Sequence, residues 1–480
     1  MRSTAPTSIS RRTSSAPPVS VRSPAPRIPG WSSSASNFSS RHARQPSLPT
    51  IRGMKWTLVL ALVLAFPALP QEEMSSRDKI RQARDSGKRG PEAIPQLEPL
   101  LRDADVEVRR EAVRAVVAIG TQHSLDPLVA ACGDNDSEIQ IFATDGLVNF
   151  YLPGYVETGL SGTIRRAGDM ITARWRSDES REVVDPDVPV RPEIITALGR
   201  ITTGGSSMAS RANAARAVGI LRGNAALPDL LEALRSKDDR LIFESLIAIQ
   251  KLRDPAAGPR VTFLLRDLEE KVQRAAIETV GLMRTPEAVP DLELVLGDTR
   301  SKNVRREAMF ALGRIATPDL RELFLRYLND RDNDLRAAAA EGLGRIGQTG
   351  DLPMVRRSFE EERRNGPRLA FAFASVALGD TAMTEFAPLR YLVNSLTQRA
   401  WRDVAIPYLS ELSVKQPVRA ALYTALPAGT RDEKTGIAYA LSATAAPDAV
   451  EPLEALMRDP DPVIGTEAVR ALRILRSRIR

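Results

Sequence analysis

Few side chains in this sequence could carry out nucleophilic, acid–base or metal chemistry. Its 480 residues include two histidines, His42 and His123, and a single cysteine, Cys132. One cysteine cannot form a disulfide framework, a zinc ribbon or an iron–sulfur cluster. His123 lies in the turn Gly120-Thr121-Gln122-His123, with no acidic or nucleophilic residue at a spacing typical of a catalytic triad. We therefore expect no catalytic residue, no metal and no cofactor.

The residues best suited to binding gather in one stretch, from about 150 to 192. Aromatic residues make up only 5% of the chain. This stretch combines several of them with arginines, and both residue types are common in binding hot spots. The candidate partner-binding residues are Tyr151, Tyr155, Arg165, Arg166, Arg174, Trp175 and Arg176. The alternative is an irregular loop, or a helix that packs back on the rest of the protein.

Arginine also recurs along the chain at a nearly constant interval. Six arginines form a column: Arg109, Arg211, Arg305, Arg336, Arg368 and Arg402. A functional interpretation makes the column a line of anion-binding guanidinium groups. We prefer a structural interpretation, in which an arginine pairs with an acidic residue six or seven positions earlier, as Asp103 precedes Arg109 and Asp298 precedes Arg305. Paired ions are far more often part of a scaffold than of a binding site.

These arginines mark an internal repeat. Val108-Arg109-Arg110-Glu111-Ala112 returns as Val304-Arg305-Arg306-Glu307-Ala308, and Leu335-Arg336-Ala337-Ala338-Ala339 follows the same pattern. Equivalent positions are 109, 140, 211, 242, 273, 305, 336, 368, 402, 434 and 465, spaced by 31 to 34 residues except for one step of 71. The long step is one repeat plus the insertion at about 150–192. A fixed interval of this length indicates a stacked-repeat protein.

Each unit is predicted to contain two helices. The first helix often has a proline near its start, such as Pro228 or Pro290, where a missing N–H costs little. A loop such as Asp103-Ala104-Asp105 follows, and its carboxylates can accept the free N–H groups of the next helix. The second helix is rich in alanine and ends in sequences such as Gly313-Arg314-Ile315, where small residues let neighbouring helices approach closely.

The pattern resembles HEAT repeats, in the short form associated with phycobilin lyases, from about Pro91 to the C-terminus. The resemblance implies an all-α fold, a right-handed α-solenoid of about ten or eleven HEAT-like helix pairs. Five positions depart from the arginine column: Gln140, Ile242, Gln273, Lys434 and Gly465. The units after Gly379 are degenerate, so the number of C-terminal repeats stays open.

Two classes of enzyme contain repeats similar to these. Deoxyhypusine hydroxylases of this fold bind a di-iron centre through recurring His-Glu pairs, and this sequence contains no His-Glu dipeptide. Bilin lyases would need a tetrapyrrole pocket, for which the sequence has no distinctive marker. An activity transferred from the repeat alone would rest on fold analogy.

The distribution of charge argues against a nucleic-acid partner. The net charge is +7, but residues 1–53 contain eight arginines and no acidic residue. The remaining chain therefore carries 59 basic and 60 acidic residues, a net charge of −1. A near-neutral body lacks the field that attracts a phosphate backbone. A binder similar to the HEAT-like alkylpurine glycosylases would still need a basic groove.

The N-terminal region divides into two segments. Residues 1–53 are mostly Ser, Pro, Arg and Ala, which predicts a disordered leader or a misassigned start. Residues 54–71 resemble a secretory signal peptide, because Met54-Lys55-Trp56-Thr57 precedes the apolar run from Leu58 to Leu69. An organellar transit peptide is one alternative. A membrane span is another, but the run is shorter than the ~20 residues that a helix needs to cross a bilayer.

These observations predict that residues 72–480 form one α-solenoid, with no stable membrane span in the mature chain and export to the periplasm or the extracellular space. We expect a non-catalytic scaffold that binds a protein partner through the solenoid surface and the insertion at 150–192. The alternatives are an enzyme related to bilin lyases or deoxyhypusine hydroxylases, and a HEAT-like nucleic-acid binder.

Overall fold

The computed structural model describes residues 74–155 and 183–479, which belong to one unit of the chain, Glu73–Arg480. The predictions for the leader at 1–53, the signal peptide at 54–71 and most of the insertion lie outside the described residues. Within the two described ranges all regular structure is helical and no strand occurs. The all-α prediction is therefore confirmed.

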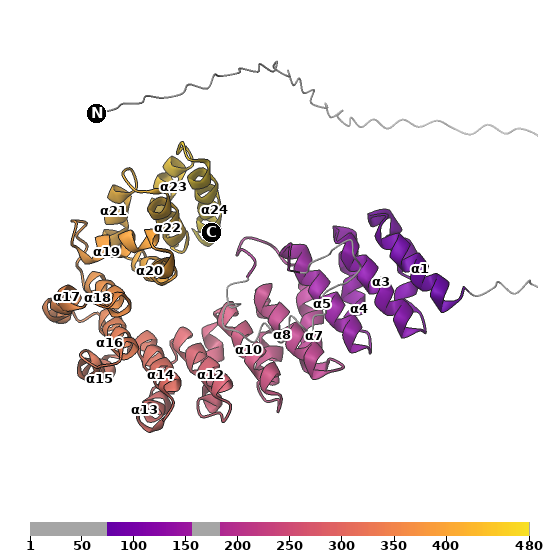
Figure 1. Ribbon diagram of the computed structural model, residues 1–480, viewed down its shortest axis with the longest axis horizontal. Coiled ribbons are helices and arrows are strands. Elements are labelled where there is room, and N and C mark those ends of the chain that lie inside the picture. Colours follow the sequence, from indigo (N-terminus) through magenta and orange to yellow (C-terminus); the bar gives the residue numbers. More distant parts are fainter. Residues whose placement is uncertain (1–73, 156–182, 480) are drawn as a thin grey trace, which may run out of the picture. The chain divides into compact units, whose positions relative to one another are not determined.

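The helices form two layers, and the first helix of each pair lies in the outer one. The outer helices are α2 (Ile94–Leu97), α4 (Leu125–Ala131), α7 (Pro192–Gly204), α9 (Leu227–Ala233), α11 (Gly258–Val261), α13 (Val289–Asp298), α15 (Arg321–Tyr327), α17 (Leu352–Glu361), α19 (Pro388–Asn394), α21 (Gln416–Ala425) and α23 (Val450–Leu456). Figure 1 shows α13, α15 and α17 on the outer side of the row.

The second helices are longer and stack side by side. They are α3 (Val106–Ile119), α5 (Ser137–Tyr151), α8 (Met208–Ile220), α10 (Asp239–Leu252), α12 (Glu270–Leu282), α14 (Lys302–Ile315), α16 (Asn333–Ile346), α18 (Asn365–Ala377), α20 (Arg399–Leu412), α22 (Arg431–Ser442) and α24 (Pro462–Ile479). The helix α1 (Ser76–Gly87) packs against α3 at the N-terminal end of the row.

Short 3-10 turns join or end the helices. They are Pro91–Ala93, Leu100–Arg102, Gln122–Ser124, Asn224–Ala226, Pro255–Ala257, Thr262–Leu264, Pro286–Ala288, Pro318–Leu320, Thr349–Asp351, Ser395–Thr397 and Pro447–Ala449. The Asp-rich loops cap the second helices as expected. Asp136, for example, accepts the backbone N–H groups of Glu138 and Ile139.

The repeat register found in the sequence is also the register of the structure. Each equivalent position is the fourth residue of a second helix, as Arg109 is in α3 and Arg305 in α14. The rule also holds for Arg402 in α20, Lys434 in α22 and Gly465 in α24. The degenerate units after Gly379 therefore continue the same row of helices, and the α-solenoid is confirmed.

Close packing of successive second helices depends on small residues. A Cβ added at Gly281 of α12 would lie 2.8 Å from the Cα of Ala311 on α14. The same addition at Gly344 of α16 would lie 2.7 Å from the Cα of Ala374 on α18. Both distances are too short for any side chain, so glycine sets the spacing between these helices.

The row of second helices bends, which brings distant parts of the sequence together. Glu411 at the end of α20 accepts a hydrogen bond of 2.6 Å from Arg284, 127 residues earlier. Asp185 accepts one of 2.7 Å from Arg470 on α24, 285 residues later. Figure 1 shows α24 opposite α8 and α10 across this bend. We call the side of the second helices that is turned away from the first helices the inner face.

None of the helices in the described ranges is both long and apolar enough to cross a bilayer.

Candidate functional site

Two of the predicted partner-binding residues, Tyr151 and Tyr155, lie within the described residues, and both contact the solenoid itself. Tyr155 is 6% exposed and interacts electrostatically with Arg216 of α8. The hydroxyl of Tyr151 accepts a hydrogen bond of 3.3 Å from the backbone N–H of Arg191. Aromatic side chains thus anchor the beginning of the insertion. The other five candidates, Arg165, Arg166, Arg174, Trp175 and Arg176, lie outside the described residues.

The end of the insertion also contacts α8. Val184 is 3% exposed. Its backbone N–H donates to the carbonyl of Ile220 at 3.0 Å, and its carbonyl accepts from Nε of Arg222 at 3.0 Å. Because Tyr155 and Val184 both contact α8, the two described ends of the insertion lie at the same helix.

Residues 183–187, here called the bridging segment, also reach the C-terminal helix. The carboxylate of Asp185 binds Arg470 of α24 at 2.7 Å and lies 3.5 Å from Arg473. Asp187 forms an ion pair of 2.6 Å with the same Arg473. These arginines are about half exposed, so the contact is screened by salt. The bridging segment therefore contacts α8 through a backbone hydrogen bond and α24 through ion pairs.

The arginine column has structural roles, but its pairing differs from the expectation. Arg109 donates to the main-chain carbonyl of Asp103 at 3.0 Å, not to its carboxylate. The carboxylate that binds Arg109 belongs to Asp134 in the following loop, with N–O distances of 2.8 and 3.1 Å. Arg336 likewise binds Glu362 of the following loop at 2.9 Å. Each of these arginines lies between two loops, so it ties its unit to the next one.

The other arginines of the column keep only the bond to a carbonyl of the preceding loop, or form different contacts. Arg211 and Arg305 donate to the carbonyls of Gly205 and Thr299 at 2.8 and 3.0 Å, so Asp298 is not the partner of Arg305. Arg368 lies over the rings of Phe359 and Tyr391, 5.0 and 4.9 Å from their centroids.

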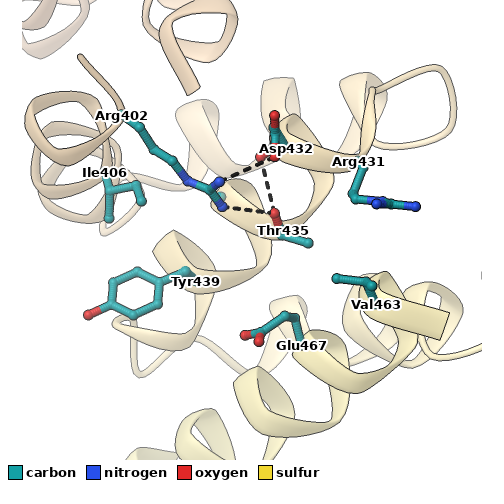
Figure 2. A pocket seen from close by; sticks show the side chains of 9 residues that line it. Arg402, Ile406, Arg431, Asp432, Thr435, Tyr439, Val463 and Glu467 are labelled. Atoms are coloured by element: carbon teal, nitrogen blue, oxygen red, sulfur yellow. Dashed lines mark hydrogen bonds and ion pairs between the residues drawn. The ribbon is translucent and has the colours of Figure 1, made fainter. Parts of the chain in front are cut away.

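Arg402 lines a cavity of about 260 Å³ between α20, α22 and α24 (Figure 2). Its guanidinium donates to Asp432 at 3.2 Å and to Thr435 at 3.1 Å, as the dashed lines in Figure 2 show. Tyr439 and Val463, 51% and 46% exposed, form an apolar part of the wall. This arginine therefore also pairs within the protein, and the cavity is a small feature of the scaffold.

The inner face carries a polar stripe that the sequence analysis missed. Its members occupy some of the sixth, ninth and thirteenth positions of the second helices, a spacing that places them on one side of each helix, and apolar residues such as Phe142, Ile247 and Phe310 occupy others. The ninth residue of one helix contacts the sixth residue of the next. Asn213 donates to Asp145 at 2.9 Å, and Arg216 forms a salt bridge with Glu244 in which each side chain is 8% exposed. The repeat register was a partial signal for the stripe, because Asn213 and Glu244, like Arg314 and Arg345, lie 31 residues apart.

At α16 the polar stripe becomes a buried network around Arg345. This side chain is 10% exposed and donates to Glu341 at 2.7 Å, to Glu411 at 3.0 Å and to the carbonyl of Gly313 at 3.0 Å. The hydroxyl of Tyr408 donates to Glu341 at 2.6 Å. Burial and the adjacent carboxylate raise the pKa of Tyr408 well above its ordinary value, which keeps the hydroxyl a donor. The network holds α20 against α16.

One contact in the polar stripe brings two carboxyl groups together. Glu278 is the ninth residue of α12, and Glu307 is the sixth residue of α14. Burial, followed by the like charge of Glu278, raises the pKa of Glu307 to about 7. Arg314 and Arg274 oppose this rise from 3.9 and 3.8 Å. Glu307 therefore exchanges a proton near neutral pH.

Three arginines lie in turns where the fold favours glycine. Arg222, Arg253 and Arg284 follow α8, α10 and α12 at intervals of 31 residues, and their φ angles are 53°, 59° and 51°. Gly120 and Gly347 occupy the equivalent turns after α3 and α16. We call these three arginines the turn row. The 31-residue interval could have identified it in the sequence.

The residues considered for chemistry lie apart from the inner face. Cys132 is buried at the end of α4, and burial raises the pKa of its thiol to about 12, so the thiol keeps its proton at neutral pH. His123 is exposed in the turn Gln122–Ser124. Among the described residues no group of three or more His, Cys, Asp and Glu side chains could hold a metal ion.

Comparison with protein families identifies the repeat. Models of HEAT repeats match residues 77–147 and 292–374. A model of the PBS lyase HEAT-like repeat matches residues 210–236. These matches identify HEAT-like repeats in the matched segments, and the paired helices continue between and beyond them. No curated protein matches the chain.

Similar solved structures include human deoxyhypusine hydroxylase in complex with glycerol, which is 22% identical, with a TM-score of 0.26; the match covers 53% of this chain and 96% of that chain. YibA of Escherichia coli is 16% identical, with a TM-score of 0.36, covering 64% of this chain and 98% of that one. An engineered protein is 19% identical, with a TM-score of 0.31, covering 84% and 97%. All three scores are below 0.5, so the fold assignment rests on the repeat models and the helices themselves.

Proposed function

We propose that this chain is a non-catalytic scaffold of the extracytoplasmic space, which binds a protein partner through the inner face of its solenoid and through the insertion at 150–192. The observation that carries the proposal is the inner face, a surface formed by the row of second helices, on which polar and charged side chains recur in several units. Stacked repeats make extended concave surfaces of this kind, which suit large or elongated partners.

The position of the insertion supports the same function. Its described ends, Tyr155 and Val184, both contact α8 on the inner face. Insertions in repeat proteins map to loops on one face, which is often the binding face. A partner bound along the inner face would therefore meet the insertion as well.

The non-catalytic part of the proposal rests on the state of the polar side chains. The thiol of Cys132 is buried and protonated, which makes it a poor nucleophile. The six arginines of the arginine column bind carboxylates, carbonyls or aromatic rings of the chain itself. Metal analysis and absorption spectra of the purified full chain test this part, because bound iron or a tetrapyrrole would contradict it.

The proposed export rests on the signal-like segment at 54–71. N-terminal sequencing of the mature chain, with fractionation of cells that express the full gene, tests it. We expect a chain that begins shortly after the apolar run and is recovered outside the cytoplasm. An unprocessed chain in the cytoplasmic fraction would contradict export.

Partner binding is tested by chemical crosslinking and pull-down from envelope fractions. A variant lacking residues 157–182 keeps the anchors Tyr155 and Val184, so the solenoid should fold as before. The wild type should recover a partner that this variant recovers weakly or not at all. A variant with Glu322→Gln on the outer helix α15 is the control and should match the wild type. Equal recovery by all three would remove the insertion from the proposal, and recovery of no specific partner would overturn the proposal.

A further inference from the structure

Arg253, the middle residue of the turn row, has no partner within the described residues. Arg222 donates to the carbonyl of Val184, and Arg284 donates to the carboxylate of Glu411 at 2.6 Å. Both oxygens belong to distant segments that the bend brings onto the inner face. Arg253, between these two arginines, forms no hydrogen bond or ion pair with any described residue, although it is exposed at the surface.

A second guanidinium with free donors lies near Arg253. Nη1 of Arg314 is buried without a hydrogen bond and is 3.9 Å from the carboxyl group of Glu307. Loss of hydration at the protein surface is the main cause that lowers the pKa of Arg253. Repulsion from Arg314 lowers this pKa further, and the negative charge of Glu278 opposes the change. The guanidinium groups of Arg253 and Arg314 lie close enough to repel each other, and both keep donors without a hydrogen bond.

The backbone at Arg253 is also unfavourable for its residue type. A residue other than glycine is less stable with a positive φ than in a right-handed conformation. The chain uses Gly120 and Gly347 in the equivalent turns, where this cost disappears. Ala316 has a φ of 50° in the equivalent turn after α14, so the repeat itself imposes this conformation. Arg253 differs from Ala316 in carrying a guanidinium group that has no partner among the described residues.

We propose that Arg253, with Arg314 beside it, binds a carboxylate of an extended acidic peptide segment in the protein partner. This inference rests on the proposed function and names the chemistry of the partner. The turn row already binds oxygen acceptors of the chain itself, the carboxylate of Glu411 among them. A guanidinium group binds a carboxylate in a bidentate pair, which would satisfy the free donors of Arg253.

The spacing of the turn row sets the spacing of acidic residues in the peptide. Neighbouring second helices lie roughly 8–10 Å apart. A peptide in the extended polyproline II conformation advances about 3.1 Å per residue with three residues per turn, so every third side chain points the same way and meets the next arginine of the row. Arg284 is still 60% exposed and keeps room for a second carboxylate. Nucleic acid fits less well, because Glu278 and Glu307 interrupt the positive surface that a phosphate backbone needs.

Fluorescence anisotropy with two labelled peptides and the full chain tests the proposal. The first probe is Glu-Ser-Ser-Glu-Ser-Ser-Glu, and the second has the same composition with its three glutamates adjacent. The first should bind more tightly. Arg253→Gly should weaken its binding about tenfold or more, the usual effect of losing a charged hydrogen-bonding partner. Because glycine suits a positive φ, this variant should fold at least as stably as the wild type.

Two further variants separate the site from general charge effects. Arg314→Gln should also weaken binding of the first peptide. Arg260→Gln, on the outer helix α11, removes the same charge and should leave binding unchanged. Equal binding of both peptides, or binding that Arg253→Gly leaves intact, would overturn the inference. Tighter binding of a DNA duplex that Arg253→Gly abolishes would assign the site to nucleic acid and also overturn it.

The peptide and pull-down experiments distinguish a failure of this binding site from a failure of the proposed scaffold function. If the wild type recovers its partner but Arg253→Gly leaves both peptide binding and partner recovery unchanged, the scaffold function stands and this site is wrong. If peptide binding depends on Arg253 but no partner is recovered from envelope fractions, the site stands and the proposed function is wrong.

Discussion

Glu307→Gln should stabilise the protein at alkaline pH and change little at acidic pH. The carboxyl group is buried beside Glu278, and its pKa is raised from 4.5 to about 7. Because this pKa is higher in the folded than in the unfolded chain, the folded state binds the proton more tightly. The free energy of unfolding of the wild type therefore falls as the pH rises from about 4.5 to about 7.

The size of the effect follows from the shift in pKa. At about 1.4 kcal/mol per pKa unit, the change corresponds to roughly 3 kcal/mol. The side chain of Glu307 is 18% exposed, so solvent screens only part of this energy. Glutamine has nearly the same shape and carries no charge, so the variant escapes the penalty at every pH. We expect the variant to exceed the wild type by up to about 3 kcal/mol above pH 8 and to match it near pH 4.

Urea unfolding followed by circular dichroism at pH 4, 6 and 9 measures this difference. Repeat proteins can unfold in steps, so the midpoints of the variant and the wild type are compared directly. Glu287→Gln, at an exposed position of the turn before α13, is the matched control and should give the same difference at each pH. The reasoning is refuted if Glu307→Gln gives a difference that does not grow with pH, or destabilises the protein at pH 9.

The remaining predictions concern packing, the bridging segment and the thiol. Gly342→Ala places a Cβ 2.4 Å from the ring of Phe324 and should lower the free energy of unfolding by about 1–3 kcal/mol. Gly297→Ala meets no atom within 4 Å and should stabilise α13 by up to about 1 kcal/mol. Thermal melts of the two variants compare these effects. Asp187→Asn should speed hydrogen exchange in α24 at low salt, with a smaller effect at high salt, and identical exchange to the wild type at low salt would contradict the ion pair. Cys132 should react with a maleimide at pH 8 about a thousandfold more slowly in the native chain than in urea, because burial raises its pKa from 9.0 to about 12; rapid labelling of the native chain would show that the thiol is accessible.

The repeat could be predicted from the sequence because local signals agree at each unit. The arginine column marks the fourth residue of every second helix, and substitutions in it keep part of its chemistry. Gln140 still donates to the carbonyl six residues earlier, at 2.7 Å. Lys434 still binds a carboxylate of the following loop, Asp459, at 2.8 Å. The contact of Lys434 helps to keep the helices after Gly379 in register although their sequences are degenerate.

The functional groups were harder to predict because they depend on contacts between units. The sequence places Asp103 near Arg109, but the stacking of loops decides that Asp134 supplies the carboxylate. The bond between Arg284 and Glu411 exists only because the row bends, and no local pattern encodes that bend. The raised pKa of Glu307 likewise depends on burial between two units. The turn row was visible as a 31-residue interval, but only the positive φ angles and the missing partner of Arg253 single it out.

Site-specific photo-crosslinking tests most directly whether the inner face binds the partner. A photoreactive residue replaces Ile247, the ninth residue of α10 on the inner face, or Glu322, which is 76% exposed on the outer helix α15. Irradiation of cells that express each full-length variant should give a discrete adduct of one partner from position 247 and none from position 322. Adducts from position 322 alone, or the same adducts from both positions, would contradict binding through the inner face.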